Sequence, residues 1–152
     1  MKLSEIIDKE AIVTDLAARH KKEVLEELCQ AMARVQDLKV QPLLEVLLER
    51  ERLGSTGIGD GIAIPHGKSS QVKQLQVACG RSKQGVDFES MDGRLTHLFF
   101  LLVAPESSTG IHLKALAKIS RLLKDENFRQ ELMSAETQTE IFDLIAARDT
   151  DF

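Results

Sequence analysis

The apolar residues between His20 and Val35 recur mostly at intervals of three and four positions, and lysines and glutamates fill the positions between them. This is the pattern of an amphipathic helix with one buried face. A second helical pattern begins near Pro42 and ends at Gly54, a residue suited to the end of a helix. Three more helices are predicted over about residues 109–124, 126–134 and 137–147, and a short one over residues 3–8.

Strands are predicted at residues 62–65, 75–82 and 98–104, with a short one around Ile12 and Val13. The run LFFLLVA at 98–104 is apolar at every position, which is typical of a strand buried on both faces of a sheet. The chain has no internal repeat and no linker rich in Pro, Gly or Ser, so residues 1–152 are interpreted as one domain. The order of elements favours an α/β or α+β fold with helices on both faces of the sheet.

Composition argues against several classes of function. The formal net charge is -4 and the charged residues are spread along the chain, so neither nucleic-acid binding nor a membrane-surface patch is expected. Trp and Tyr are absent, which leaves few platforms for stacking bases. Cys29 and Cys79 lie far apart, as expected of reduced thiols. The N-terminus is acidic and no apolar run reaches membrane-spanning length, so we expect a soluble cytoplasmic protein without membrane insertion.

The stretch GSTGIGDGIAIPHGK, residues 54–68, is rich in glycine and ends in a Pro-His-Gly sequence around His66. A dinucleotide-binding fingerprint would open a helix after a strand, whereas here an apolar strand follows the glycines. A P-loop is excluded because the residues before Lys68 lack its register. Two interpretations stay open. One is a loop of low bulk that a phosphate approaches closely, with Pro65 fixing the presentation of His66, and the other is an ordinary turn.

Arg50 and His112 are the residues whose context suits chemistry at His66. A histidine that carries a phosphoryl group attacks as a neutral imidazole and then needs cationic or N–H partners for the phosphoryl oxygens. Arg50, near the end of the second helix, offers a forked donor, or is a solvated arginine that complements the helix dipole. His112, in the first turn of a helix, is disfavoured as a cation and would donate one N–H, or is an ordinary surface histidine.

The remaining titratable residues near these segments are interpreted as structural. They comprise two histidines without a chemical context and a pair of carboxylates on a helix face: His20, His97, Glu49 and Glu51. A metal site built from His66, His112 and Asp60 has no short ligand spacing to support it. We therefore expect no metal and no cofactor.

The run RERLGSTGIGDGIAIPHGK, which starts at Arg50, resembles the active-site signature of the enzyme IIA domains of the fructose/mannitol class in the bacterial phosphoenolpyruvate-dependent phosphotransferase system. It is most similar to the nitrogen-regulatory type. The resemblance extends over nearly the whole chain, through LSEIIDKEAIVTDL, GVDFESMDGRLTHLFFLLVAP and GIHLKALAKISRLL. It implies a single α/β domain with a central mixed sheet of about five strands, flanked by helices on both faces.

The resemblance also implies roles for individual residues. His66 lies at the position of the family's phosphoryl acceptor, and Arg50 and His112 lie at the positions of its active-site arginine and second histidine. Three further residues are candidate phosphate contacts: Ser55, Thr56 and Gly67.

The expected function is that of a histidine phosphocarrier, which receives a phosphoryl group from HPr or its nitrogen-type counterpart and has no small-molecule turnover of its own. Two roles stay open. In the favoured one, the phosphorylation state regulates binding to other proteins through a face around His66, Ile58, Ile62 and Ile64, because no second domain follows to tether an enzyme IIB. In the other, the group passes to a fructose- or mannitol-type enzyme IIB. A non-catalytic module is disfavoured because all three site residues are present.

Overall fold

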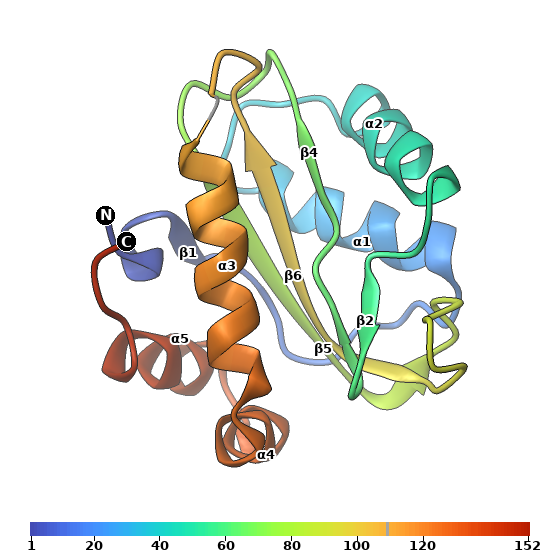
Figure 1. Ribbon diagram of the computed structural model, residues 1–152, viewed down its shortest axis with the longest axis vertical. Helices are drawn as coiled ribbons and strands as arrows, with labels where there is room; N and C mark the ends of the chain where they lie inside the picture. The colour runs from blue at the N-terminus through green and yellow to red at the C-terminus, as the bar shows by residue number, and fades with distance from the viewer. Residues whose placement is uncertain (109) are drawn as a thin grey trace.

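The computed structural model describes residues 1–108 and 110–152, and within them six strands form one open mixed sheet (Figure 1). In chain order the strands are β1 (Ile7–Val13), β2 (Gly57–Gly59), β3 (Ile62–Ala63), β4 (His66–Lys68), β5 (Gln76–Val86) and β6 (Thr96–Ala104). Their order in space is β1-β5-β6-β3-β2, and β4 pairs with β6 further along than β3 does. β5 and β6 are antiparallel, whereas β1 pairs with β5, and β3 and β4 pair with β6, in parallel.

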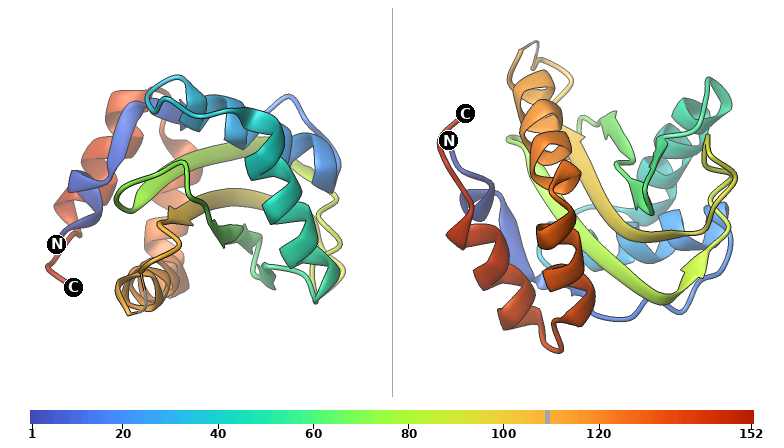
Figure 2. Two further views of the ribbon diagram at one scale, coloured as in Figure 1. Left: turned by 90° about the horizontal axis from the view of Figure 1, so that it is seen from above. Right: turned by 60° about the horizontal axis from the view of Figure 1, so that its bottom comes forward.

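Five α-helices, counted over the same described residues, cover the two faces of the sheet (Figure 2). α1 (Lys21–Ala33) and α2 (Val40–Arg52) lie on one face. α3 (Ile111–Lys124), α4 (Glu126–Ser134) and α5 (Gln138–Ala147) lie on the other. The predicted α/β class with helices on both faces is therefore confirmed. None of these helices is long and apolar enough to cross a lipid bilayer.

β6 explains why the run at 98–104 is apolar throughout. Successive side chains of a strand point to opposite faces, so Leu98, Phe100 and Leu102 enter the core beneath α3, α4 and α5. The alternate residues of β6 enter the core beneath α1 and α2, where Phe99 packs edge to face on Phe88, with ring centroids 5.3 Å apart. The strand is buried on both faces, as its sequence predicts.

The prediction of a helix over residues 3–8 is wrong for the second half of that segment. Only Leu3–Glu5 forms a short 3-10 helix, and β1 begins at Ile7. Pairing of β1 with β5 and burial of Ile7 in the core outweigh the local helical pattern. β2 and β4 were not predicted as strands, and with them the sheet has six strands within the described residues. The predicted start of the helix at Thr109 lies outside the described residues, and α3 is described from Ile111.

Arg81 joins the sheet to the C-terminal helices although it lies in the core, with 1% of its surface exposed. Its guanidinium donates to the carbonyls of Leu132, Met133 and Ala135 at the end of α4, and its Nε donates to the carbonyl of Thr14. The last carbonyls of a helix have no partner within the helix and attract a cation. Arg81 therefore satisfies the end of α4 and fixes it against β5.

Candidate functional site

His66 is the first residue of β4, and the backbone on either side of it is fixed by the sheet. It pairs with Leu102 of β6, whose N–H donates to the carbonyl of Pro65 at 2.9 Å. The imidazole is half-buried, and its Nδ1 lies 2.8 Å from the carbonyl oxygen of Ile64. Because that oxygen can only accept, Nδ1 carries the hydrogen. In the neutral ring the lone pair therefore resides on Nε2.

Two adjacent cavities share the side chains of Arg50 and His66. The first, of about 150 Å³, is also lined by Gly67, Lys68, Leu102, Ala104 and His112. The second, of about 220 Å³, is also lined by Ser55, Thr56, Ile58, Ile64, Leu116 and Ser120. The structure thus brings together Arg50 from the end of α2, His66 from β4 and His112 from the start of α3, although these residues are far apart in the sequence.

Arg50 lies in the last turn of α2 and is half-buried. Its Nη1 donates to the carbonyl oxygen of Gly54 at 2.9 Å, which anchors the guanidinium to the loop that follows the helix. The guanidinium has five N–H donors in a rigid fork, so one contact leaves the others for an anion. Arg50 can therefore present a permanent positive charge with an orientation set by Gly54.

His112 lies in the first turn of α3, where its surroundings favour the neutral form of the ring. Burial lowers the pKa of its imidazole, and the nearby charges of Lys68 and then His66 lower the pKa further. Its Nδ1 is buried and has no hydrogen-bond partner among the described residues. A neutral ring has one N–H to donate, as the sequence suggests for this position.

The three candidate phosphate contacts differ in their burial and in the hydrogen bonds that they already make. Thr56 is buried, and both its hydroxyl and its N–H donate to the carboxylate of Glu51. Ser55 is half-buried, and its Oγ accepts from the N–H of Gly57 at 3.0 Å. Gly67 lines the first cavity, but a Cβ there would point at α2 and meet Val46 Cγ1 at 2.8 Å. Gly67 therefore also allows β4 to pack closely on α2.

A model of the family described as "Phosphoenolpyruvate-dependent sugar phosphotransferase system, EIIA 2" matches residues 5–148. The chain belongs to this EIIA family. It is 40% identical over 150 residues to the fructose-specific EIIABC component of Bacillus subtilis, of whose length it spans 24%. It is 39% identical to a nitrogen regulatory protein of Bradyrhizobium diazoefficiens, with 96% of this chain and 95% of the relative covered. The crystal structure of nitrogen regulatory protein IIA-Ntr from Neisseria meningitidis superposes with a TM-score of 0.88 at 36% identity, covering 94% of this chain and 98% of that one.

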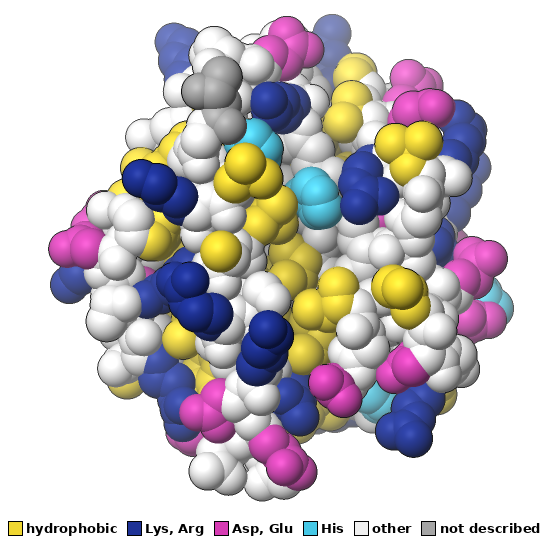
Figure 3. Space-filling view, viewed as in Figure 1, with side chains coloured by type: hydrophobic (Ala, Val, Ile, Leu, Met, Phe, Trp, Pro, Cys, Tyr) yellow, Lys and Arg dark blue, Asp and Glu magenta, His cyan; other side chains and the backbone are white. Residues whose placement is uncertain are grey.

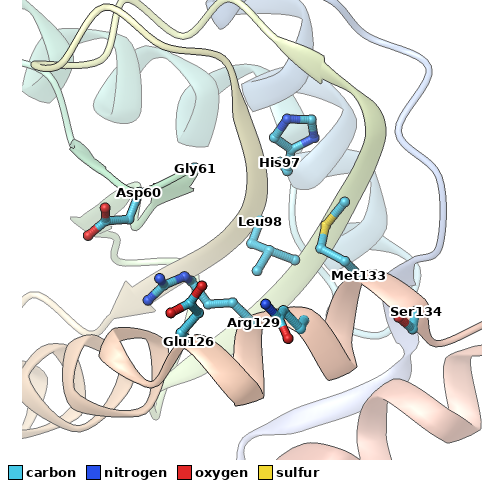
Figure 4. A pocket seen from close by; sticks show the side chains of 9 residues that line it. Asp60, Gly61, His97, Leu98, Glu126, Arg129, Met133 and Ser134 are labelled. Atoms are coloured by element: carbon cyan, nitrogen blue, oxygen red, sulfur yellow. The ribbon is translucent and has the colours of Figure 1, made fainter.

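A third cavity of the EIIA domain lies between the turn after β2 and α4, about 470 Å³ in volume (Figure 4). Two of its polar side chains, those of His97 and Arg129, are bound to backbone carbonyls. The Nδ1 of His97 lies 2.8 Å from the carbonyl oxygen of Ser82, and Arg129 donates to the carbonyls of Leu123 and Lys124 at the end of α3. No group of three or more metal-ligating side chains occurs here or elsewhere among residues 1–108 and 110–152.

The surface around His66 is apolar in part. Figure 3 shows hydrophobic side chains along the middle of the face that carries α3, β4 and β2, with cationic side chains on both sides. Ile58 is 46% exposed and Leu113 is 59% exposed. The prediction that Ile62 and Ile64 belong to a contact face is wrong, because both side chains are buried in the core beneath α3. Ile58 is thus the one isoleucine of the predicted three that is exposed.

Glu51 is the residue of this region that the sequence interpretation missed. It was interpreted with Glu49 as one of a pair of structural carboxylates on a helix face, but only 8% of its surface is exposed. A signal was present in the sequence, because Leu43 and Leu47 precede Glu51 at intervals of four residues. Such intervals place all three on the buried face of α2. A carboxylate in an apolar stripe is a candidate for a specific role.

Proposed function

We propose that this EIIA domain is a phosphocarrier in which His66 accepts a phosphoryl group from a phosphorylated HPr-like protein. The observation that carries the proposal is the shared position of Arg50 and His66 in two cavities, with Nδ1 of His66 bound to the carbonyl of Ile64. That bond leaves Nε2 as the nucleophilic nitrogen. The half-buried ring is open enough for a protein donor to reach it.

In the proposed step, the lone pair of Nε2 attacks phosphorus as the bond to the donor breaks, and that bond's electron pair returns to the donor. Arg50 and His112 stabilise the negative charge on the phosphoryl oxygens, one with a fork of charged donors and the other with a single neutral N–H. Ser55 and Gly67 are further candidate contacts. No cofactor or metal takes part, and the product is a phosphohistidine with no turnover of a small molecule.

Phosphorylation is proposed to act mainly as a regulatory signal in the cytoplasm. In support, the Bradyrhizobium relative named as a nitrogen regulatory protein matches along nearly its whole length. A phosphoryl group adds a charge of about -2 near the exposed apolar side chains of Ile58 and Leu113. Phosphorylation would then weaken the binding of proteins that dock on the apolar surface of the unphosphorylated form. It would favour the binding of proteins that bring cationic groups to His66.

Sugar transport is the second candidate function, and the fructose-specific EIIABC relative favours it. In that role the domain would pass its phosphoryl group to an enzyme IIB. Pull-downs with the wild type, His66→Ala and His66→Glu distinguish the two roles. Partner sets that differ between the variants support regulation, whereas identical sets together with rapid transfer to an enzyme IIB support transport.

Intact-mass measurement tests the phosphocarrier proposal itself. With phosphoenolpyruvate, enzyme I and the carrier protein, the wild type should gain one acid-labile phosphoryl group and His66→Ala should gain none. His97→Ala is the matched control, because His97 is also half-buried with its Nδ1 on a carbonyl oxygen, and it should be phosphorylated normally. Phosphorylation of His66→Ala would show that the acceptor is another residue.

A further inference from the structure

Glu51 is a buried carboxylate with a complete set of donors. Its oxygens accept from the backbone N–H of Thr56 at 3.1 and 3.3 Å and from the hydroxyl of Thr56. The Nζ of Lys21, the first residue of α1, lies 3.1 Å from Oε1 of Glu51. Burying an isolated carboxylate is strongly unfavourable, and these contacts offset the cost of burying Glu51.

Lys21 is itself held in place, so the pair is a fixed junction between three segments. Its side chain is 16% exposed, and its Nζ lies 5.0 Å from the ring centroid of Phe88. The ion pair with Glu51 therefore ties α1 to the end of α2, and the contacts of Glu51 with Thr56 tie both helices to the loop at residues 54–56. This loop precedes the strands that lead to His66.

Hydrogen bonds lead from this loop to two residues of the site. On one side, the carbonyl of Gly54 accepts from Arg50 and orients the guanidinium. On the other, the carbonyl of Thr56 accepts from the N–H of Ile64 at 3.1 Å, and the carbonyl of Ile64 binds Nδ1 of His66 at 2.8 Å. The position of the loop thus affects the direction of Arg50 and, through Ile64, the tautomer of His66.

We propose that Glu51, paired with Lys21, is a positioning residue for phosphoryl transfer, which holds the 54–56 loop so that Arg50 and Nε2 of His66 face the same phosphoryl group. This inference rests on the proposed function. Glu51 does not touch the phosphoryl group, since a carboxylate would repel it and the side chain is buried. Thr56 then serves the site through its bonds to Glu51 rather than as a phosphate contact.

Glu51→Ala and Glu51→Gln test the role, with Glu49→Gln as the matched control on the exposed side of the same helix. Small misplacement of reacting groups can cost about 10²-fold in rate. We expect Glu51→Ala to lower the maximal transfer rate by roughly 10- to 100-fold, and Glu51→Gln by less. The carrier concentration at half-maximal rate should stay within about twofold, because the docking surface is unchanged. Glu49→Gln should behave as the wild type.

A second variant that loses as much stability as Glu51→Ala shows whether Glu51 acts on the site or only stabilises the fold. Leu132→Ala removes a core side chain in α4, on the opposite face of the sheet from Glu51. If it lowers the transfer rate as much as Glu51→Ala at the same loss of stability, the inference is wrong. If Glu51→Ala does not fold, Thr56→Val and Thr56→Ser replace it: the first should be slow and the second close to the wild type. Equal rates in both would also overturn the inference.

The NMR signal of the Arg50 Nε–H gives a readout that needs no phosphoryl transfer. It should shift in Glu51→Gln, whereas the signal of Arg52, which pairs with Glu49 on the surface, should not. If the wild type gains no phosphoryl group and the Arg50 signal still shifts, the proposed function fails, and what remains is that Glu51 orients Arg50. If the wild type is phosphorylated and Glu51 variants transfer at the normal maximal rate, only the positioning role fails.

Discussion

Replacing Arg50 by lysine is the sharpest test of how the site would bind a phosphoryl group. The change keeps the positive charge, the helix and much of the side-chain length, but it replaces a rigid fork by a single ammonium. In the wild type, Nη1 of Arg50 donates to the carbonyl of Gly54, and its other N–H groups have no hydrogen-bond partner among residues 1–108 and 110–152 and line the cavity beside His66. A lysine ammonium at this position is a single group, so it cannot bind both the carbonyl of Gly54 and the phosphoryl oxygens in the way that the guanidinium fork does.

The expected cost follows from the number of donors lost. Removing one preorganised donor to a developing charge typically lowers a rate by about 10²- to 10³-fold, which corresponds to roughly 3–4 kcal/mol. Arg50→Lys loses the bidentate geometry and keeps a point charge, so we expect an effect near the lower end, about 10²-fold. The fold should be unaffected, because Arg50 is only half-buried and makes no ion pair among the described residues.

Rapid-quench transfer from the phosphorylated carrier measures this effect. Arg52→Lys is the matched control, because Arg52 lies two residues further along α2, is exposed, and pairs with Glu49 on the surface. It should transfer at the wild-type rate, since exposed ion pairs contribute little. If Arg50→Lys transfers within about twofold of the wild type while remaining folded, the bidentate role of Arg50 is refuted.

Two further predictions concern the packing and the titration of the site. Gly67→Ala should lower the free energy of unfolding, measured in urea, by about 1–3 kcal/mol, because its Cβ would lie 2.8 Å from Val46 Cγ1. Adding Val46→Ala should restore part of this loss, and no recovery would show that the strain lies elsewhere. The lowered pKa of His112 means that the unfolded chain binds its proton first as pH falls below 6.5, so folding stability should decline there as the imidazole becomes charged. Unfolding measured at about pH 7.5 and about pH 5 should show a smaller decline in His112→Asn than in the wild type, and an equal decline would contradict the assignment.

The elements with a strong repeating pattern were predictable from the sequence. α1 and α2 have one apolar face each, and β6 is apolar throughout because alternate residues enter two different cores. β4 was missed, and β1 was predicted only at its end, around Ile12 and Val13, for opposite reasons. The segment from Ile7 carries three exposed polar residues and becomes a strand by pairing with β5, whereas His66–Lys68 is too short for any pattern and is a strand only because β6 lies beside it.

The residues that line the candidate site could be predicted from the sequence, but the buried residues that hold the structure around it could not. His66 was identified by its unusual neighbours, and Arg50 and His112 by their helix ends; the structure places all three around one cavity. Glu51 and Arg81 were missed because charged residues are usually exposed. The spacing of their neighbours indicated that both are buried. Arg81 follows Val77 and Cys79 at the two-residue interval of a buried strand face, and Glu51 follows leucines at the four-residue interval of a buried helix face.

The topology of β4 explains how His66 can be both rigid and open to a protein donor. β3 and β4 pair one after the other along the same edge of β6, at Leu98–Phe99 and then at Leu102–Ala104. β2 covers the outer edge of β3, and its end nearest β4 is Gly57, opposite Ala63, so within the described residues no strand covers the outer edge of β4. A histidine inside the sheet would be rigid but inaccessible, and one in a free loop would be accessible but poorly oriented. On β4, one side of the backbone is fixed by β6 and the other faces the cavities shared with Arg50, so the proposed nucleophile needs no rearrangement of the fold to meet its donor.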